Sequence, residues 1–237
     1  MGFKFKQFTI EHDACAMKVG TDSIMLGSWI QTKNAQYILD IGTGSGLLSI
    51  MLAQKSQDTC LIDGIDIDAA AISQAKGNAN NCRWAERLTF QQISLQNFDT
   101  ATKYDLIVSN PPYFSPNLTA NKTCLNSNRL TARQTLALDH QTLLEQVRER
   151  LSNKGRFCCV LPKDIGDLFI KDAELIGLNC TQAMHVRPKP HADITRLLLE
   201  FSRENKVKFT ESISIYNELG KYSVEYIALC KNYYFNF

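Results

Sequence analysis

Short apolar runs alternate with amphipathic stretches along most of this chain, starting near residue 36. Seven of the runs are predicted to be strands, at residues 37–41, 60–66, 88–92, 104–109, 155–161, 180–186 and 195–201. The stretches between them predict helices at 47–54, 69–80 and 136–151, and Asp68 is placed to cap the second helix. Because strands alternate with helices and are almost continuously apolar, we expect an α/β fold with a mostly parallel sheet covered on both faces.

Length, composition and charge are those of one compact domain. The 237 residues are 44% hydrophobic and 21% charged, and the formal net charge is +2. We therefore predict a single domain over residues 1–237, in which residues 1–35 form an N-terminal extension before the first main strand. The net charge excludes a strongly basic nucleic-acid coat, but it leaves room for a local basic patch.

Neither the N-terminus nor the cysteines indicate export or a metal. The N-terminus has no apolar signal core, and the longest apolar stretch, residues 39–53, is interrupted by three glycines. The eight cysteines include no C-x-x-C pair, and Cys158 and Cys159 should point to opposite faces of a strand. We expect a cytoplasmic protein with reduced thiols, no membrane association and no metal site.

A glycine-rich turn follows the first predicted strand and opens a helix, where free backbone N–H groups face a ligand. Asp66, at the end of the second strand and 20 residues after Gly46, can accept both ribose hydroxyls of a nucleoside. The turn reads G-x-G-x-G after an aspartate, not G-x-G-x-x-G, and so resembles the S-adenosylmethionine turn of class I methyltransferases. Asp40 suits the amino group of the methionine part. The candidate cofactor-binding residues here are Asp40, Gly42, Thr43, Gly44, Gly46, Asp66 and Ile67.

The tetrapeptide Asn110-Pro111-Pro112-Tyr113 closes the fourth predicted strand, where strand ends of α/β sheets line the ligand crevice. The prolines fix the backbone and remove two N–H donors. The acceptors that remain are the Asn110 side-chain carbonyl and the Pro111 backbone carbonyl, beside the aromatic ring of Tyr113. This set matches a planar amino group with two N–H bonds, such as adenine N6, cytosine N4 or a glutamine amide. We therefore predict an amino-group N-methyltransferase, with these four residues catalytic and Asn110 also touching the cofactor.

Segments spread over the whole chain share one family resemblance. They are residues 5–8, 17–29, 40–46, 110–113 and 187–190, together with Arg196 and the aromatic tail after Tyr222. The chain as a whole resembles the bacterial tRNA1(Val) (adenine-37-N6)-methyltransferase family. That resemblance implies a class I methyltransferase (Rossmann-like) fold with a seven-stranded, mostly parallel sheet and helices on both faces. It also implies that S-adenosylmethionine donates a methyl group to N6 of adenine 37 in the anticodon loop of tRNA1(Val), and we expect a monomer.

The resemblance also assigns further cofactor contacts. Lys18, Thr21 and Asp22 would lie near the methionine end, although Thr21 is also a reasonable N-cap for a helix over residues 23–30. Related enzymes often carry an acid after the third strand that touches the cofactor adenine. The corresponding stretch here has no acid, so the Ile93 N–H or the Ser94 hydroxyl is expected to serve instead.

A stem-loop RNA needs phosphate neutralisation and a base that leaves its stack. Three basic groups lie near predicted strand ends: Lys4 with Lys6, a second group just after Tyr113, and a third that also holds His185 and His191. The second group is the best candidate for the anticodon arm, because it follows the catalytic turn. The predicted RNA-binding residues are Lys122, Arg129, Arg133, Arg187, Lys189 and Arg196.

Other activities fit the sequence less well. An N6-adenine methyltransferase of ribosomal RNA is the main alternative. A glutamine N-methyltransferase shares the tetrapeptide but usually has a longer helical N-terminal domain. A DNA adenine methyltransferase would need a separate recognition domain, for which the chain has no room. A nucleotide-dependent oxidoreductase would need different glycine spacing, and a catalytically silent RNA-binding protein would not need Asp40, Asp66 and Asn110 together.

Overall fold

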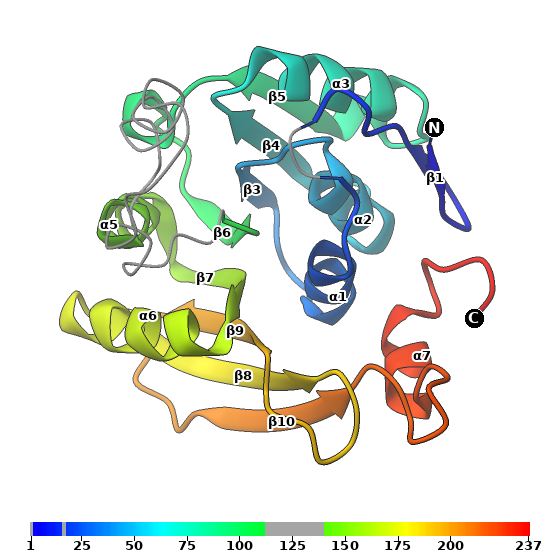
Figure 1. Cartoon of the computed structure of the whole chain (residues 1–237). Helices are drawn as coiled ribbons and strands as arrows, with labels where there is room; N and C mark the ends of the chain where they lie inside the picture. The colour runs from blue at the N-terminus through cyan, green and yellow to red at the C-terminus, as the bar shows by residue number, and fades with distance from the viewer. Residues whose placement is uncertain (1, 16–17, 112–139) are drawn as a thin grey trace, which may run out of the picture.

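The computed structural model describes residues 2–15, 18–111 and 140–237. Its centre is one eight-stranded sheet with the order β10-β8-β9-β7-β6-β3-β4-β5 (Figure 1). All neighbouring strands are parallel except β9, which is antiparallel to both β7 and β8. The strands are β3 (Tyr37–Ile41), β4 (Leu61–Asp66), β5 (Leu88–Gln92), β6 (Tyr104–Ser109), β7 (Leu151–Pro162), β8 (Asn179–Arg187), β9 (Arg196–Ser202) and β10 (Phe209–Ser214).

The sheet has one strand more than the seven predicted. The seven expected strands are present with ends shifted by at most one residue, except that β7 begins four residues earlier than predicted. Strand β10 adds an eighth at the edge beside β8. Its first four residues are exposed and Ile213 is its single buried side chain. A strand with so little buried surface has no apolar run to reveal it, which is why the pattern missed it.

Helices cover both faces of the sheet, as predicted. The side chains of α1, α2 and α7 share one apolar core with Ile38, Leu106 and Cys158, and α5 and α6 share the other with Leu39 and Cys159. The adjacent cysteines therefore do point to opposite faces, and the seven cysteines of the described residues are all free thiols. The helices are α1 (Thr21–Trp29), α2 (Leu47–Lys55), α3 (Ala69–Asn80), α5 (His140–Arg150), α6 (Lys163–Leu175), α7 (Val224–Cys230), and the 3-10 turns η1 (Ala85–Arg87) and η2 (Leu95–Asn97).

The helix ends test the predicted caps. The α3 prediction is confirmed at both ends, and the Asp68 carboxylate accepts a hydrogen bond from the Ala70 N–H at 2.8 Å. The cap prediction for Thr21 is wrong. Thr21 is already the first helical residue of α1, and Gly20, which is extended and has no side chain to bond, takes the cap position. Within the described residues α5 begins at His140, and the predicted start at residue 136 lies outside them.

The N-terminal extension packs against the end of the chain. Its hairpin of β1 (Phe3–Lys4) and β2 (Thr9–Ile10) is continued by a bridge between Phe5 and Tyr234. The Lys6 ammonium donates to the carbonyls of Lys231 and Phe237 at 2.5 and 2.8 Å. Lys6 was expected in a basic group for RNA, but its charge serves to join the two ends of the chain.

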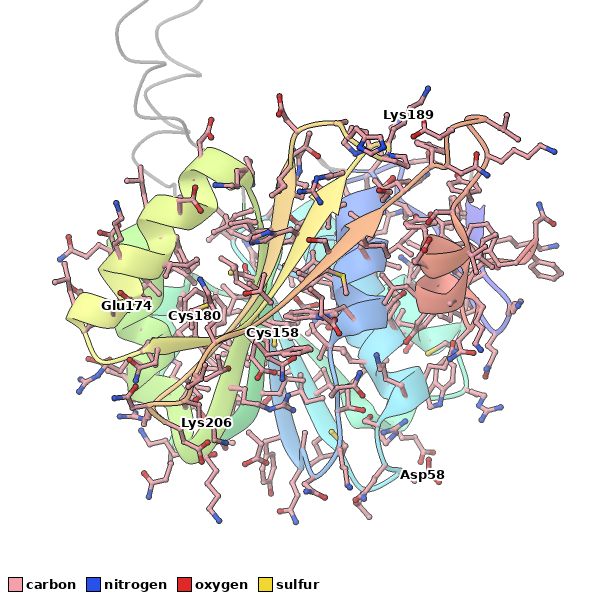
Figure 2. All side chains as sticks on the ribbon, turned by 90° about the horizontal axis from the view of Figure 1, so that it is seen from below. Asp58, Cys158, Glu174, Cys180, Lys189 and Lys206 are labelled. Atoms are coloured by element: carbon pink, nitrogen blue, oxygen red, sulfur yellow. The ribbon has the colours of Figure 1, made fainter. Side chains whose placement is uncertain are left out.

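One edge of the sheet gathers the predicted site residues. The parallel strands β3, β4, β6, β7, β8 and β10 all end there, and because β9 runs the other way its first residue, Arg196, lies at the same edge, opposite Pro162 and Val186. Figure 2 shows Lys189 beyond the ends of the strands at this edge, whereas Asp58 and Lys206 lie at the opposite one. Ligands of open α/β sheets bind at the edge where the strands end.

Candidate active site

The turn after β3 is open on one side. Gly42 and Gly44 have φ angles of 69° and 55°, and a Cβ built on either would meet no atom within 4 Å. The N–H groups of Gly42 and Thr43 both donate to the Ile65 carbonyl, at 2.9 and 3.0 Å, which fastens the turn to the end of β4. The result is a rigid backbone with free space above it, as a closely approaching ligand requires.

Asp40 lies beneath this turn and has no solvent-exposed surface. Its Oδ2 accepts hydrogen bonds from the Thr43 hydroxyl at 2.7 Å and from the Ser49 N–H and hydroxyl at 3.1 and 2.7 Å. Burial raises the pKa of Asp40 to about 6, although the hydrogen bonds from Thr43 and Ser49 act in the opposite direction. Oδ1 is buried without a hydrogen-bond partner among the described residues. Asp40 thus holds the turn and keeps one acceptor atom for a donor group.

Asp66 is the last residue of β4 and faces the same turn. Its Oδ2 accepts from the Gly44 N–H and its Oδ1 from the Asp68 N–H, each at 3.0 Å. An ionised carboxylate has about four acceptor positions, so two stay available for a diol. The Ile67 side chain beside it is 47% exposed and offers an apolar surface for a base.

One of the two alternatives for the adenine contact is wrong. The Ile93 N–H donates to the Asp66 carbonyl at 2.9 Å and extends the β4–β5 pairing, so the amide is already used. Ser94 caps η2 by accepting from the Asn97 N–H at 3.3 Å. A hydroxyl that accepts there still has its own hydrogen to donate, so Ser94 stays a candidate.

Asn110 stands at the end of β6, directly after Ser109, whose hydroxyl donates to the Ile41 carbonyl at 2.9 Å. The Asn110 Nδ2 donates to the Ser23 hydroxyl in the first turn of α1, at 2.9 Å. Pro111 is buried. Pro112 and Tyr113 lie outside the described residues, so their part of the prediction is untested.

Two residues that the sequence assigned to different ligands contact each other. The Arg196 Nε donates to the Asp22 Oδ2 at 2.8 Å, which joins the start of β9 to the first turn of α1. Arg196 was expected to bind RNA and Asp22 to bind the cofactor. Their ion pair also holds the start of β9 against the first turn of α1. Lys18 and Thr21, also assigned to the cofactor, are both exposed.

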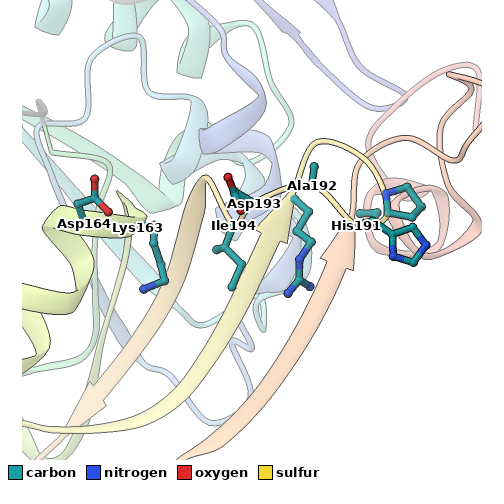
Figure 3. Close-up of a pocket in the computed structure, with 9 residues that line it drawn as sticks. Lys163, Asp164, His191, Ala192, Asp193 and Ile194 are labelled. Carbon is teal, nitrogen blue, oxygen red and sulfur yellow. The ribbon is translucent and has the colours of Figure 1, made fainter.

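A hollow of about 870 Å³ opens at the same edge, between the start of α6 and the loop after β8 (Figure 3). The Arg187 guanidinium has no hydrogen-bond or ion-pair partner within the part of the chain that the structure describes, whereas Lys163 pairs with Asp167. Lys122, Arg129 and Arg133 lie outside the described residues. The hollow is lined by basic and acidic side chains together, among them Lys163, Asp164, Arg187, His191 and Asp193.

Sequence reasoning missed two residues that shape this site. Ser23 gave no signal, because a serine in the first turn of a helix is ordinary. Asn78 does carry a signal in the sequence, because it lies on the apolar face of α3 with Ile72, Ala75 and Ala79. A polar side chain buried on such a face needs hydrogen-bond partners. Asn78 accepts from the Glu11 N–H and donates to the carbonyls of Glu11 and Ser45, at 2.9, 2.8 and 2.8 Å, so it ties the N-terminal extension to the glycine turn.

Comparison with known proteins identifies the family. The model of the Methyltransferase small domain family matches residues 14–168. The tRNA1(Val) (adenine(37)-N6)-methyltransferase of Pseudoalteromonas atlantica is 47% identical, over all of this chain and 98% of the relative. The protein of the same name from Yersinia pseudotuberculosis is 39% identical, over all of this chain and 93% of the relative. The chain belongs to the tRNA1(Val) (adenine(37)-N6)-methyltransferase family. This confirms the family predicted from the sequence.

Solved structures support the fold of this methyltransferase family member. A predicted O-methyltransferase from Agrobacterium tumefaciens has a TM-score of 0.69 and 12% identity, over 90% of this chain and 96% of that one. A SAM-dependent O-methyltransferase from Thermotoga maritima has a TM-score of 0.55 and 14% identity, over 81% and 68%. Both agree with the class I methyltransferase fold. Among the described residues no helix is long and apolar enough to cross a membrane, and no group of three or more His, Cys, Asp or Glu is arranged to hold a metal.

Proposed function

We propose that this chain methylates the exocyclic N6 of adenine 37 in the anticodon loop of tRNA1(Val), with S-adenosylmethionine as the donor. The observation that carries the proposal is the whole-chain identity of 47% to a relative of that name. The acceptor Asn110 lies next to the glycine turn, because Ser109 just before it pairs with Ile41, which directly precedes Gly42.

The residues of the turn fit S-adenosylmethionine. The open space above Gly42 and Gly44 admits a ligand, the Asp66 carboxylate has acceptor positions for a ribose diol, and the buried Oδ1 of Asp40 has no donor among the described residues. The ammonium group of the methionine part of the cofactor would supply the missing donor to Oδ1. In our proposal Ser94 and Ile67 lie on the adenine side and Lys18, Thr21 and Asp22 on the methionine side. When bound, the sulfonium supplies an electrophilic methyl group.

Asn110 and Pro111 prepare the amine. An amino group conjugated to a ring is a poor nucleophile, because its lone pair is delocalised. Two carbonyl acceptors, the Asn110 Oδ1 and the Pro111 backbone oxygen, take its two N–H bonds and localise the lone pair on nitrogen. The same two contacts would also hold the amine nitrogen in line with the methyl group, and positioning of reacting atoms contributes up to about 7–11 kcal/mol in favourable systems. Pro112 and Tyr113 complete the site in our proposal, with the ring stacked on the flipped base at about 1–3 kcal/mol.

We place the RNA backbone along the edge that runs from Asn110 toward β8 and β10. Arg187 borders the hollow there and Lys189 extends beyond the strand ends (Figure 2). Neighbouring strands are about 4.8 Å apart, so the end of β8 lies about 14 Å along the sheet from the end of β6. Arg196 lies between them. Lys122, Arg129 and Arg133 are kept as candidate contacts to the anticodon arm, on the strength of their place after the tetrapeptide.

The test is methyl transfer from labelled S-adenosylmethionine to unmodified total tRNA, ribosomal RNA and a release factor in parallel, followed by nucleoside analysis. We expect label in N6-methyladenosine at position 37 of tRNA1(Val). Label in ribosomal RNA alone would keep the amine chemistry and overturn the substrate. Label only on protein would show that neither adenine nor RNA is the methyl acceptor, and would overturn the proposed substrate altogether.

A further inference from the structure

We infer that Ser23 is a positioning residue that sets the orientation of the Asn110 side-chain amide for methyl transfer, an inference that rests on the proposed function. The decisive contact is the hydrogen bond from the Asn110 Nδ2 to the Ser23 hydroxyl, at 2.9 Å. Ser23 touches neither reacting group in this assignment, because it acts through the amide alone.

The orientation of the amide decides whether Asn110 works. An asparagine amide has an acceptor oxygen at one end and two N–H donors at the other. The oxygen is the end that must meet the N–H bonds of the target amine, and a rotation of 180° would present donors to donors. A partner that fixes Nδ2 on one side therefore fixes Oδ1 on the other.

The first turn of α1 is itself anchored from the opposite direction. Asp22, the neighbour of Ser23, accepts the Arg196 Nε at 2.8 Å, and the Arg196 Nη1 donates to the Thr195 carbonyl at 2.9 Å. The start of β9 thus fixes this turn. Ser109, directly before Asn110, is bonded to β3, so the backbone on both sides of the Ser23–Asn110 contact is fixed.

This arrangement explains why an N-terminal helix lies against the end of β6. Its first turn is polar and supports the amide, while its later residues, Ile24, Met25 and Leu26, are buried in the core shared with α2. The helix therefore transmits the rigidity of that core to one catalytic side chain. Preorganised groups of this kind lose activity when their support is removed, even when the catalytic group itself is intact.

The experiment is a double-mutant cycle on the full-length enzyme with unmodified tRNA. We expect S23A to lower kcat about tenfold while the KM for S-adenosylmethionine changes less than about twofold, because the cofactor contacts are untouched. S23T keeps the hydroxyl and should recover most of kcat. S28A is the matched control, since Ser28 is a buried serine near the other end of the same helix, and it should leave kcat unchanged.

The cycle separates this inference from the proposed function. N110A should lower kcat about 100-fold or more, and S23A combined with N110A should be no slower than N110A alone, because Ser23 acts through the amide. If N110A is slow but S23A equals wild type, or if the two losses multiply, the positioning role of Ser23 is refuted and the proposed chemistry stands. If N110A retains full activity, the proposed chemistry itself fails.

Discussion

The carboxylate of Asp66 offers a direct test of how the cofactor ribose is held. Two of its roughly four acceptor positions take the N–H groups of Gly44 and Asp68, which leaves two for the ribose hydroxyls. In a D66N variant the side chain would have one acceptor oxygen with two positions, and its NH₂ would face one of the two N–H groups. The substitution therefore removes one or two of the four hydrogen bonds and the charge that strengthens the others.

The expected loss follows from these bonds. A hydrogen bond to a charged group contributes about 1.5–3 kcal/mol, and the loss of one, with weakening of a second, gives about 2–4 kcal/mol. At 1.4 kcal/mol per factor of ten, D66N should bind S-adenosylmethionine roughly 30- to 1,000-fold more weakly. Isothermal titration with S-adenosylhomocysteine measures this without turnover.

Asp68 provides the matched control for this experiment. It is two residues away and its carboxylate also accepts a backbone N–H, that of Ala70 at 2.8 Å. Asparagine caps a helix about as well as aspartate, so D68N should bind the cofactor like wild type. The reasoning is refuted if D66N binds within threefold of wild type, or if D68N is weakened as much as D66N.

Three further predictions concern charge. Burial raises the pKa of Asp40 to about 6, above its unfolded value of 3.8, so the stability contributed by the protonated form is full below pH 3.8 and is lost as the pH rises through 6. In urea unfolding, the wild type should therefore lose about 1 kcal/mol of stability relative to D40N between pH 5 and pH 7.5. Equal pH profiles of the two proteins would contradict this. R156A should lower the free energy of unfolding by about 3–5 kcal/mol, because the buried Glu200 carboxylate loses its hydrogen bond from the Arg156 Nη1 at 2.7 Å. Adding E200Q to R156A should restore part of this loss, because the side chain left behind is then uncharged. R187A should weaken tRNA binding and reduce the slope of log K against log salt by about 0.7–0.9 with cofactor binding unchanged, whereas K206A, at the opposite edge, should alter neither.

Local signals were enough for most of the fold. Helix α3 could be predicted to the residue because its cap, Asp68, and its apolar face are both written in one short stretch. The strands next to the glycine turn and before Asn110 were equally visible, because strands buried on both faces are continuously apolar. Strand β10 was not, because it lies at an edge and buries only Ile213.

The candidate site was predictable in its residues but not in how they are connected. The sequence pointed to Asp40, Asp66 and Asn110, yet it could not show that the Ile93 N–H is used by the Asp66 carbonyl. Nor could it show that Arg196 pairs with Asp22, 174 residues earlier. Such contacts depend on which segments the fold brings together. A single sequence shows the order of strands and helices along the chain, but it does not show which distant side chains contact each other.

The bonds from Lys6 to the carbonyls of Lys231 and Phe237 have a consequence for the order of folding. The first hairpin leaves the ribosome long before Lys231, Tyr234 and Phe237, the residues against which it packs. It cannot dock in this arrangement until they are synthesised, and by then every strand of the central sheet has already been translated. Docking of the hairpin is therefore a late step of co-translational folding, taken against a sheet whose strands are all present.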